Sequence, residues 1–318
     1  MKSYFEPDSR WELYGIANNE QFVQQFVVKG FFHEGVPKDV KDAYTTVEYL
    51  LAHAYYFWPM FDEAFNKALR VLEMAVKLKA KQLSISSENI KPNKKIESKK
   101  LIKLIEEICN KPHLSYLNNN LNRARKIRNS QMHPDSNSYM GGIGGLGKNL
   151  KLFVNVINDL FRSDELMIVQ FAQKKAIEKQ IKTFENNLVV LDDHTNRILV
   201  SSILDFLVLN KTLILVCNLV LRNTKQVLEE HKYLKPIGFA LFNYEVQKGL
   251  LTGSSNDGHE IKIYKTMNVE NLQQYTNHLN ELNSVNQTDR ALYEHYINGE
   301  ASWSLVELEY NYLSKNLI

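Results

Sequence analysis

Cysteine, proline and glycine are all scarce in this chain of 318 residues. The two cysteines, Cys109 and Cys217, lie far apart in apolar surroundings. One chain cannot build a disulfide framework or a cysteine-based zinc site from them, so we expect two buried free thiols. Because there are only 13 glycines and 7 prolines, collagen-like and low-complexity classes are also excluded.

Long uninterrupted apolar segments are lacking as well. The longest apolar stretch, residues 199–221, contains Asp205 and Lys211, whereas a membrane-spanning helix needs about 20 predominantly apolar residues. The residues that follow Met1 contain no apolar segment of the kind found in a secretory signal. We therefore expect a cytoplasmic protein that has no membrane partner.

The excess of positive charge is small, with a net charge of +3 and a pI near 8.5. This excess is too weak to indicate a nucleic-acid partner by itself, but the basic residues gather in two segments. The first, which includes Lys94 and Lys95, is interpreted as a solvated, lysine-rich loop over residues 84–100. The second segment contains Arg123, Arg125, Lys126 and Arg128.

The length and the 44% hydrophobic content predict about two domains. Apolar residues repeat at helical spacing in the first half. This pattern predicts an all-α antiparallel bundle over residues 39–165, which follows a helical extension at residues 1–38. Pro59 is expected to separate the first two bundle helices. The expected helices cover residues 21–28, 38–54, 65–79, 101–109, 116–132 and 150–161.

The second half has a different pattern, which predicts a smaller mixed region over residues 180–318 and an α+β fold class for the whole chain. Two β-branched runs flank a polar turn, which indicates a hairpin. Residues 213–221 are so apolar that a buried strand and a buried helix are both compatible with them. The other expected elements are strands at 188–191, 197–200 and 260–265 and a helix at 271–283.

A glycine-rich segment, residues 141–149, matches the spacing of two phosphate-binding motifs from Gly142 onward. Such a loop needs a preceding strand, and the type that ends in lysine needs Ser or Thr directly after it. The upstream residues are polar, and Asn149 follows Lys148. We therefore interpret the segment as a connection between two helices.

Arginine followed by histidine after four intervening residues occurs twice. Arg290 and His295 have no basic surroundings, and we interpret them as surface structure. Arg128 and His133 instead belong to an arginine-rich helix, in which Asn129 follows the arginine directly. The apolar face of this helix is predicted to be buried, and Asn129 and His133 share a polar stripe on the opposite side.

On an ideal helix Arg128 and His133 lie about 140° apart, so they do not converge within one straight helix. Two arrangements could bring these residue types together. Pro134 disfavours helical geometry at His133 and could reorient the ring, or two copies of the chain could share the site across a two-fold axis. We favour the second arrangement.

A helical bundle in which a long helix carries Arg-Asn, three residues and then His-Pro resembles the HEPN superfamily (higher eukaryotes and prokaryotes nucleotide-binding), with its R-x4-6-H motif. The resemblance covers residues 39–163. It implies a metal-independent, cofactor-free endoribonuclease with a composite site at a homodimer interface. It further implies a role as a toxin or antiphage effector, under the control of an antitoxin or another regulatory partner. By this resemblance Arg128 is the motif arginine, Asn129 the polar residue that follows it, and His133 the motif histidine.

The chemistry of these residue types suits metal-independent RNA cleavage. The ribose 2′-hydroxyl is then the nucleophile, and the expected products are a 2′,3′-cyclic phosphate and a 5′-hydroxyl. Histidine can exchange a proton near neutrality, and arginine can stabilise the charge that develops on the phosphate. The basic residues expected to guide the RNA backbone are Arg123, Arg125, Lys126, Lys94 and Lys95.

Three other interpretations fit the same residues. The motif could be a salt-bridged helix end in which His133 caps backbone carbonyls and Pro134 terminates the helix. The chain could be a non-catalytic dimerisation module that binds nucleic acid or protein, since its long C-terminal region lies outside the resemblance. By analogy with other HEPN proteins, it could be the nucleotide-binding partner of a transferase.

Overall fold

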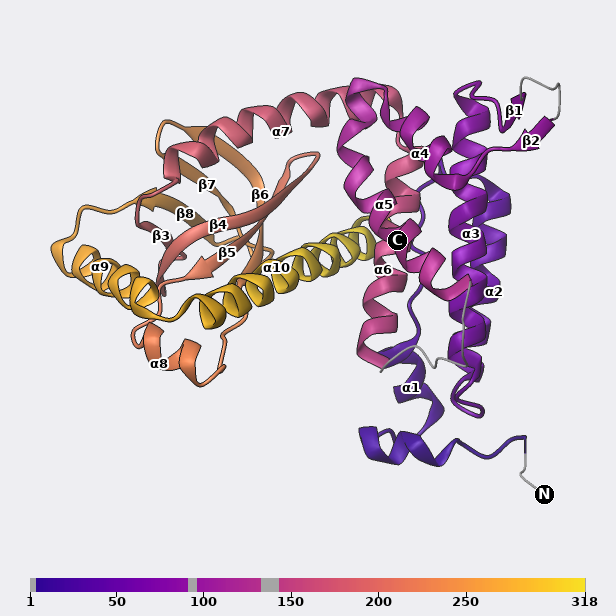
Figure 1. Cartoon of the computed structure of the whole chain (residues 1–318), viewed down its shortest axis with the longest axis horizontal. Coiled ribbons are helices and arrows are strands. Elements are labelled where there is room, and N and C mark those ends of the chain that lie inside the picture. Colours follow the sequence, from indigo (N-terminus) through magenta and orange to yellow (C-terminus); the bar gives the residue numbers. More distant parts are fainter. Residues whose placement is uncertain (1–3, 91–95, 133–142, 318) are drawn as a thin grey trace. The chain divides into compact units, whose positions relative to one another are not determined.

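The computed structural model describes residues 4–90, 96–132 and 143–317. Two compact units make up the chain, and each is described by itself (Figure 1). The first unit combines Met1–Met167 with Tyr310–Ile318, and the second consists of Ile168–Glu309. None of the helices in the described ranges combines the length and the continuous apolar sequence that a bilayer crossing requires.

The first unit is built from helices and one short antiparallel hairpin. Its 3-10 helices are η1 (Ser9–Tyr14) and η2 (Pro112–Leu117), and the hairpin pairs β1 (Glu88–Ile90) with β2 (Ile96–Ser98). Its α-helices are α1 (Asn19–Phe26), α2 (Lys38–His53), α3 (Met60–Gln82), α4 (Leu101–Cys109), α5 (Asn118–Met132) and α6 (Ile143–Phe161).

The core of the first unit forms where α6 packs against α3. The residues of α6 from Leu152 to Phe161 are all buried, and Phe153 stacks on Phe65 of α3 with ring centroids 5.6 Å apart. The buried residues of α3 recur every three or four positions, as expected for one face of an amphipathic helix. The opposite, solvent-facing side of α3 remains available for a site.

Two expectations for this part of the chain are modified by the structure. The hairpin β1–β2 occupies part of the segment expected to be a lysine-rich loop. The helix α6 begins at Ile143 rather than near Leu150, so the glycine-rich segment is helical from Ile143 onward rather than a connection. Gly145 and Gly147 have open space where a side chain would be, so packing does not require glycine at either position.

A buried carboxylate helps to fix the start of the chain. Asp8 is 2% exposed and accepts hydrogen bonds from Nε and Nη2 of Arg10, each at 2.8 Å. It also accepts a bond from the backbone N–H of Trp58, at 3.4 Å. The hydrogen bonds from Arg10 outweigh the effect of burial and hold the pKa of Asp8 well below its usual range.

Replacing Asp8 by asparagine is expected to lower the free energy of unfolding by about 1.5–3 kcal/mol at pH 7, because the hydrogen bonds to a charged acceptor weaken. The depressed pKa makes the contribution of Asp8 complete above the unfolded pKa of about 3.9. It is lost as the pH falls through the lower folded value. Urea unfolding at pH 7 and in acid should therefore show the difference between the two proteins shrinking below about pH 4. A difference that stays constant over this range contradicts the assignment.

The second unit contains a closed antiparallel barrel of six strands in the order β3-β4-β5-β6-β7-β8, in which β8 pairs back with β3. Each strand pairs with its neighbour in the sequence, so the barrel is of the up-and-down type. The strands are β3 (Val189–Asp192), β4 (Arg197–Leu209), β5 (Thr212–Leu219), β6 (Ile237–Gln247), β7 (Leu250–Ser254) and β8 (Glu260–Lys265).

Apolar side chains fill the barrel, including those of Leu213, Leu215 and Cys217 on β5. Four helices accompany it: α7 (Asp164–Phe184), α8 (Thr224–Glu229), α9 (Val269–Ser284) and α10 (Gln287–Asn316). Ile177 and Phe184 of α7 belong to the same core. Gly238 on β6 lies where an added Cβ atom would be 2.6 Å from Cδ1 of Leu308 on α10, so a larger residue here would require the Leu308 side chain to shift.

The expected fold class, an all-α bundle followed by a smaller mixed region, is wrong. The structure has a closed barrel in its C-terminal half, helices at both ends and a hairpin within the first unit. The strands expected near residues 188–191, 197–200 and 260–265 are present, and residues 212–219 form a strand. The expected elements did not include β6 and β7, because the first half of β6 has no apolar–polar alternation in its sequence and β7 is only five residues long.

Both cysteines are free thiols, as predicted. Cys217 is buried within the barrel core and Cys109, at the end of α4, is half-buried. Burial raises the pKa of Cys217 to about 12 and that of Cys109 to about 11. Neither thiol is therefore activated for nucleophilic chemistry at neutral pH.

Candidate functional site

The helix α5 carries the arginine-rich motif and packs by the face that the sequence predicts. Leu121 and Ala124 are fully buried, Ile127 is half-buried, and η2 leads into the helix directly. These apolar residues fix the rotation of α5, since they lie on one face at helical spacing. The arginines of the motif are thereby directed to the other faces.

Arg128 lies between an acidic partner and its own neighbour. Its Nη2 donates to Oε2 of Glu73 on α3 at 2.8 Å, and its Nη1 donates to Oδ1 of Asn129 at 3.3 Å. The Arg128 and Glu73 side chains are 21% and 25% exposed, so the pair is partly shielded from water. Oε1 of the same glutamate lies 2.7 Å from Nζ of Lys77.

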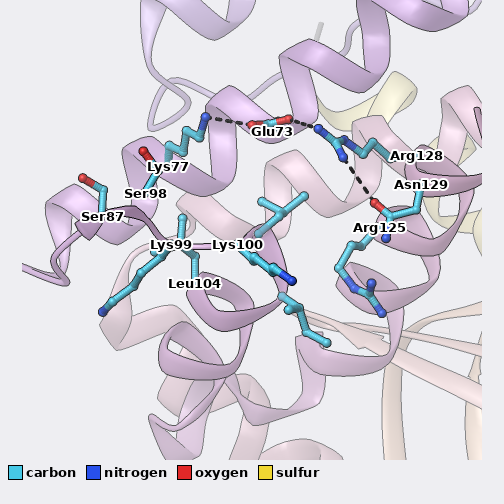
Figure 2. A pocket seen from close by; sticks show the side chains of 12 residues that line it. Glu73, Lys77, Ser87, Ser98, Lys99, Lys100, Leu104, Arg125, Arg128 and Asn129 are labelled. Atoms are coloured by element: carbon cyan, nitrogen blue, oxygen red, sulfur yellow. Dashed lines mark hydrogen bonds and ion pairs between the residues drawn. The ribbon is translucent and has the colours of Figure 1, made fainter. Parts of the chain in front are cut away.

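Glu73 is therefore held between two cations, as Figure 2 shows. Burial disfavours its ionised form, but the hydrogen bonds and charges of Lys77 and Arg128 outweigh this effect and lower the pKa of Glu73. The carboxylate remains ionised near neutral pH. It orients the Arg128 guanidinium and neutralises part of the local positive charge.

These groups line a cavity of about 680 Å³ between α3, α4, α5 and the β1–β2 hairpin (Figure 2). Among the described residues, five cationic side chains and one carboxylate contribute to its wall, so positive charge is in excess. Hydroxyls and an amide add neutral hydrogen-bonding groups. The polar lining residues are Glu73, Lys77, Ser87, Ser98, Lys99, Lys100, Arg125, Arg128 and Asn129.

The structure brings three of the sequence-predicted site residues together in this cavity, namely Arg125, Arg128 and Asn129. Two others on α5 do not line it. Arg123 is half-buried, and burial lowers its pKa, while Lys126 is exposed. The remaining predicted site residues, His133, Lys94 and Lys95, lie outside the described residues.

Sequence reasoning missed the opposite wall of the cavity. Glu73 and Lys77 form an i,i+4 ion pair on α3, and this spacing is a recognisable surface signal. Lys99 and Lys100 directly precede the apolar helix α4. Lys99 is held there by an ion pair of 2.8 Å with Glu107, whereas Lys100 is exposed, as expected for the solvated segment.

The arrangement suits an anionic ligand that contains phosphate. Arginine offers a planar set of donors to phosphate oxygens, and lysine provides a compact charge. Within the described residues no group of three or more His, Cys, Asp or Glu side chains is placed to hold a metal ion. No protein-family model, curated protein or solved structure matches this chain.

Proposed function

We propose that this protein is a metal-independent endoribonuclease of HEPN type that acts in the cytoplasm as a homodimer. The observation that supports it most is the presence of Arg128 and Asn129 in a cavity with an excess of cationic side chains. The sequence motif supplies His133 as the proton-transfer residue. A role as a toxin or antiphage effector, held in check by a regulatory partner, belongs to the same proposal.

In the proposed reaction the ribose 2′-oxygen forms a bond to phosphorus while the bond from phosphorus to the 5′-oxygen breaks. A base removes the 2′-hydroxyl proton and an acid supplies a proton to the departing 5′-oxygen. His133 performs one of these proton transfers. Arg128 donates to the phosphate oxygens that gain charge, and Asn129 is within reach to orient the guanidinium. The products are a 2′,3′-cyclic phosphate and a 5′-hydroxyl.

The test is RNA cleavage by the purified full-length chain in excess EDTA, with the products analysed by mass spectrometry. We expect cleavage to persist in EDTA, and the new 3′ ends to carry a cyclic phosphate, because the 2′-hydroxyl is the nucleophile. The all-2′-deoxy version of the same strand should remain intact. Cleavage that stops in EDTA and returns with a divalent cation, or products with 5′-phosphates, contradicts the mechanism.

A second candidate function is a non-catalytic module that dimerises and binds nucleic acid or protein. The ion pair of 2.8 Å between Arg128 and Glu73 favours it, because a purely structural arginine would be held in the same way. This module would bind RNA without cutting it. The EDTA experiment therefore separates the two functions when RNA binding is measured on the same samples.

A further inference from the structure

Four of the five cationic side chains described in the cavity form two groups that differ in their counter-ions, and the fifth, Lys99, pairs with Glu107 at 2.8 Å. Lys77 and Arg128 both pair with Glu73, so their charge is partly neutralised. Lys100 and Arg125 line the same cavity, and within the described part of the chain neither forms an ion pair with a carboxylate. Among the described residues, the Arg125 side chain donates one hydrogen bond, from Nε to Oδ1 of Asn122 at 3.0 Å. The two groups therefore differ in how readily they can accept an added anion.

The second group lies beside the first along the wall of the cavity. Arg125 and Arg128 are three residues apart on α5, which puts their Cβ atoms about 5–6 Å from each other. Lys100 approaches from the start of α4, and Figure 2 shows its ammonium end directed toward Arg125. A cavity of about 680 Å³ has room for much more than one phosphate, since pockets of roughly 300–1,000 Å³ hold ligands of drug size.

A second hollow extends the cationic surface along α3. It has a volume of about 430 Å³, shares Glu73 and Lys77 with the cavity, and adds Arg70, Met74 and Leu78. Arg70 is exposed. A surface of this kind suits a strand of repeated phosphates better than a small molecule with one anionic group, because the cationic groups are spread along it.

We propose that the cavity holds two consecutive phosphates of a single strand, one on Arg128 and the next on Lys100 together with Arg125. The proposal depends on the proposed function in one respect, namely which of the two phosphates is the scissile one. Lys100 and Arg125 are then binding residues for the neighbouring phosphate. A strand that lacks this phosphate loses their contribution.

The binding test uses a short 2′-O-methyl oligoribonucleotide, which keeps the RNA backbone but lacks the nucleophilic hydroxyl. Its affinity for the full-length protein is measured by fluorescence anisotropy at several salt concentrations. Because each phosphate contact on a single strand adds about 0.7 to the slope of log K against log salt, Lys100→Ala should reduce that slope by about 0.7. The affinity should fall about tenfold, as for loss of one charged hydrogen bond.

Lys103 provides the matched control. It lies in the first turn of α4, three residues after Lys100, and pairs with Glu106 at 2.7 Å, but it does not line the cavity. Lys103→Ala removes the same charge from the chain, so a general electrostatic effect would change both variants alike. We expect the Lys103→Ala protein to keep the wild-type slope. Equal slopes for Lys100→Ala and the wild type overturn the two-phosphate site.

Cleavage distinguishes this inference from the proposed function. The wild type should cut a dinucleotide that carries an additional neighbouring phosphate with a lower KM than the dinucleoside monophosphate, and Lys100→Ala should lose that preference. If Lys100→Ala lowers the salt slope but the wild type cuts nothing, the ribonuclease function is wrong and the two-phosphate site stands. If the wild type cuts RNA and Lys100→Ala binds with an unchanged salt slope, the two-phosphate site is wrong and the ribonuclease function stands.

Discussion

Replacing Arg128 by alanine is expected to lower the rate constant of RNA cleavage by about 10²–10³-fold, and replacing His133 by about 10²–10⁴-fold. The first variant loses the guanidinium that stabilises charge on the phosphate in the transition state. The second loses a proton-transfer group. Single-turnover cleavage with the protein in excess measures the chemical step directly. Near-wild-type cleavage by either variant contradicts the proposed roles.

The double variant of Arg128 and His133 sharpens this prediction. The effects of replacing groups that act in the same step are strongly non-additive. The double variant should therefore have about the same cleavage rate constant as the slower of the two single variants. Two independent contributions would instead multiply. The His133→Ala protein should also lose the pH dependence of the rate that a proton-transfer histidine produces, whereas the Arg128→Ala protein should keep it.

The chain contains its own control for these variants. Arg290 and His295 have the same spacing, but Arg290 pairs with Glu294 at 3.0 Å and contacts Asn283. Alanine at Arg290 or at His295 should leave cleavage unchanged. Loss of activity in these controls would show that the assay reports stability rather than chemistry. Because Arg128→Ala also deprives Glu73 of one partner, the helical content of each variant should be compared by circular dichroism.

Most α-helices of the first unit could be predicted from the sequence because they carry local signals, although η1 was not expected and α6 begins at Ile143 rather than near Leu150. The apolar segment expected at 101–109 is the helix α4. Pro59 separates α2 from α3, since α2 ends at His53 and α3 begins at Met60. The barrel could not be predicted in the same way. Closure depends on pairing β3 with β8, as in Val189 opposite Lys265, and no local pattern specifies pairing between such distant segments.

The same distinction applies to the site. Arg125, Arg128 and Asn129 are close in sequence, and helical geometry relates them directly. The ion pair of Arg128 with Glu73 spans 55 positions, and its existence depends on how α3 packs beside α5. Lys100 enters the cavity for the same reason. Sequence reasoning could therefore find one wall of the cavity but not the wall that faces it.

Replacing Trp11 by alanine is expected to destabilise the first unit by about 3–5 kcal/mol. Trp11 is 1% exposed, stacks on Trp58 at 4.5 Å and meets Phe22 edge-on at 4.6 Å between ring centroids. Its indole N–H donates to the carbonyl oxygen of Ala54 at 3.2 Å. The variant therefore leaves a large cavity and an unsatisfied acceptor where η1 meets the end of α2 and the start of α3.

Hydrogen exchange with mass spectrometry measures this effect for each unit separately. Amides of α1 and of the start of α3 should lose protection in the Trp11→Ala protein, while those of β5 should keep it, because Trp11 and β5 belong to different units. Leu13→Ala in the same 3-10 helix is the control, since Leu13 is 85% exposed and surface changes usually stay within about 0.5 kcal/mol. If protection falls equally in both units, they unfold as one cooperative body. If Trp11→Ala costs no more than Leu13→Ala, the aromatic cluster does not anchor α3. Glu73 and Lys77 would then depend for their position on the packing of α3 against α2, α4 and α6.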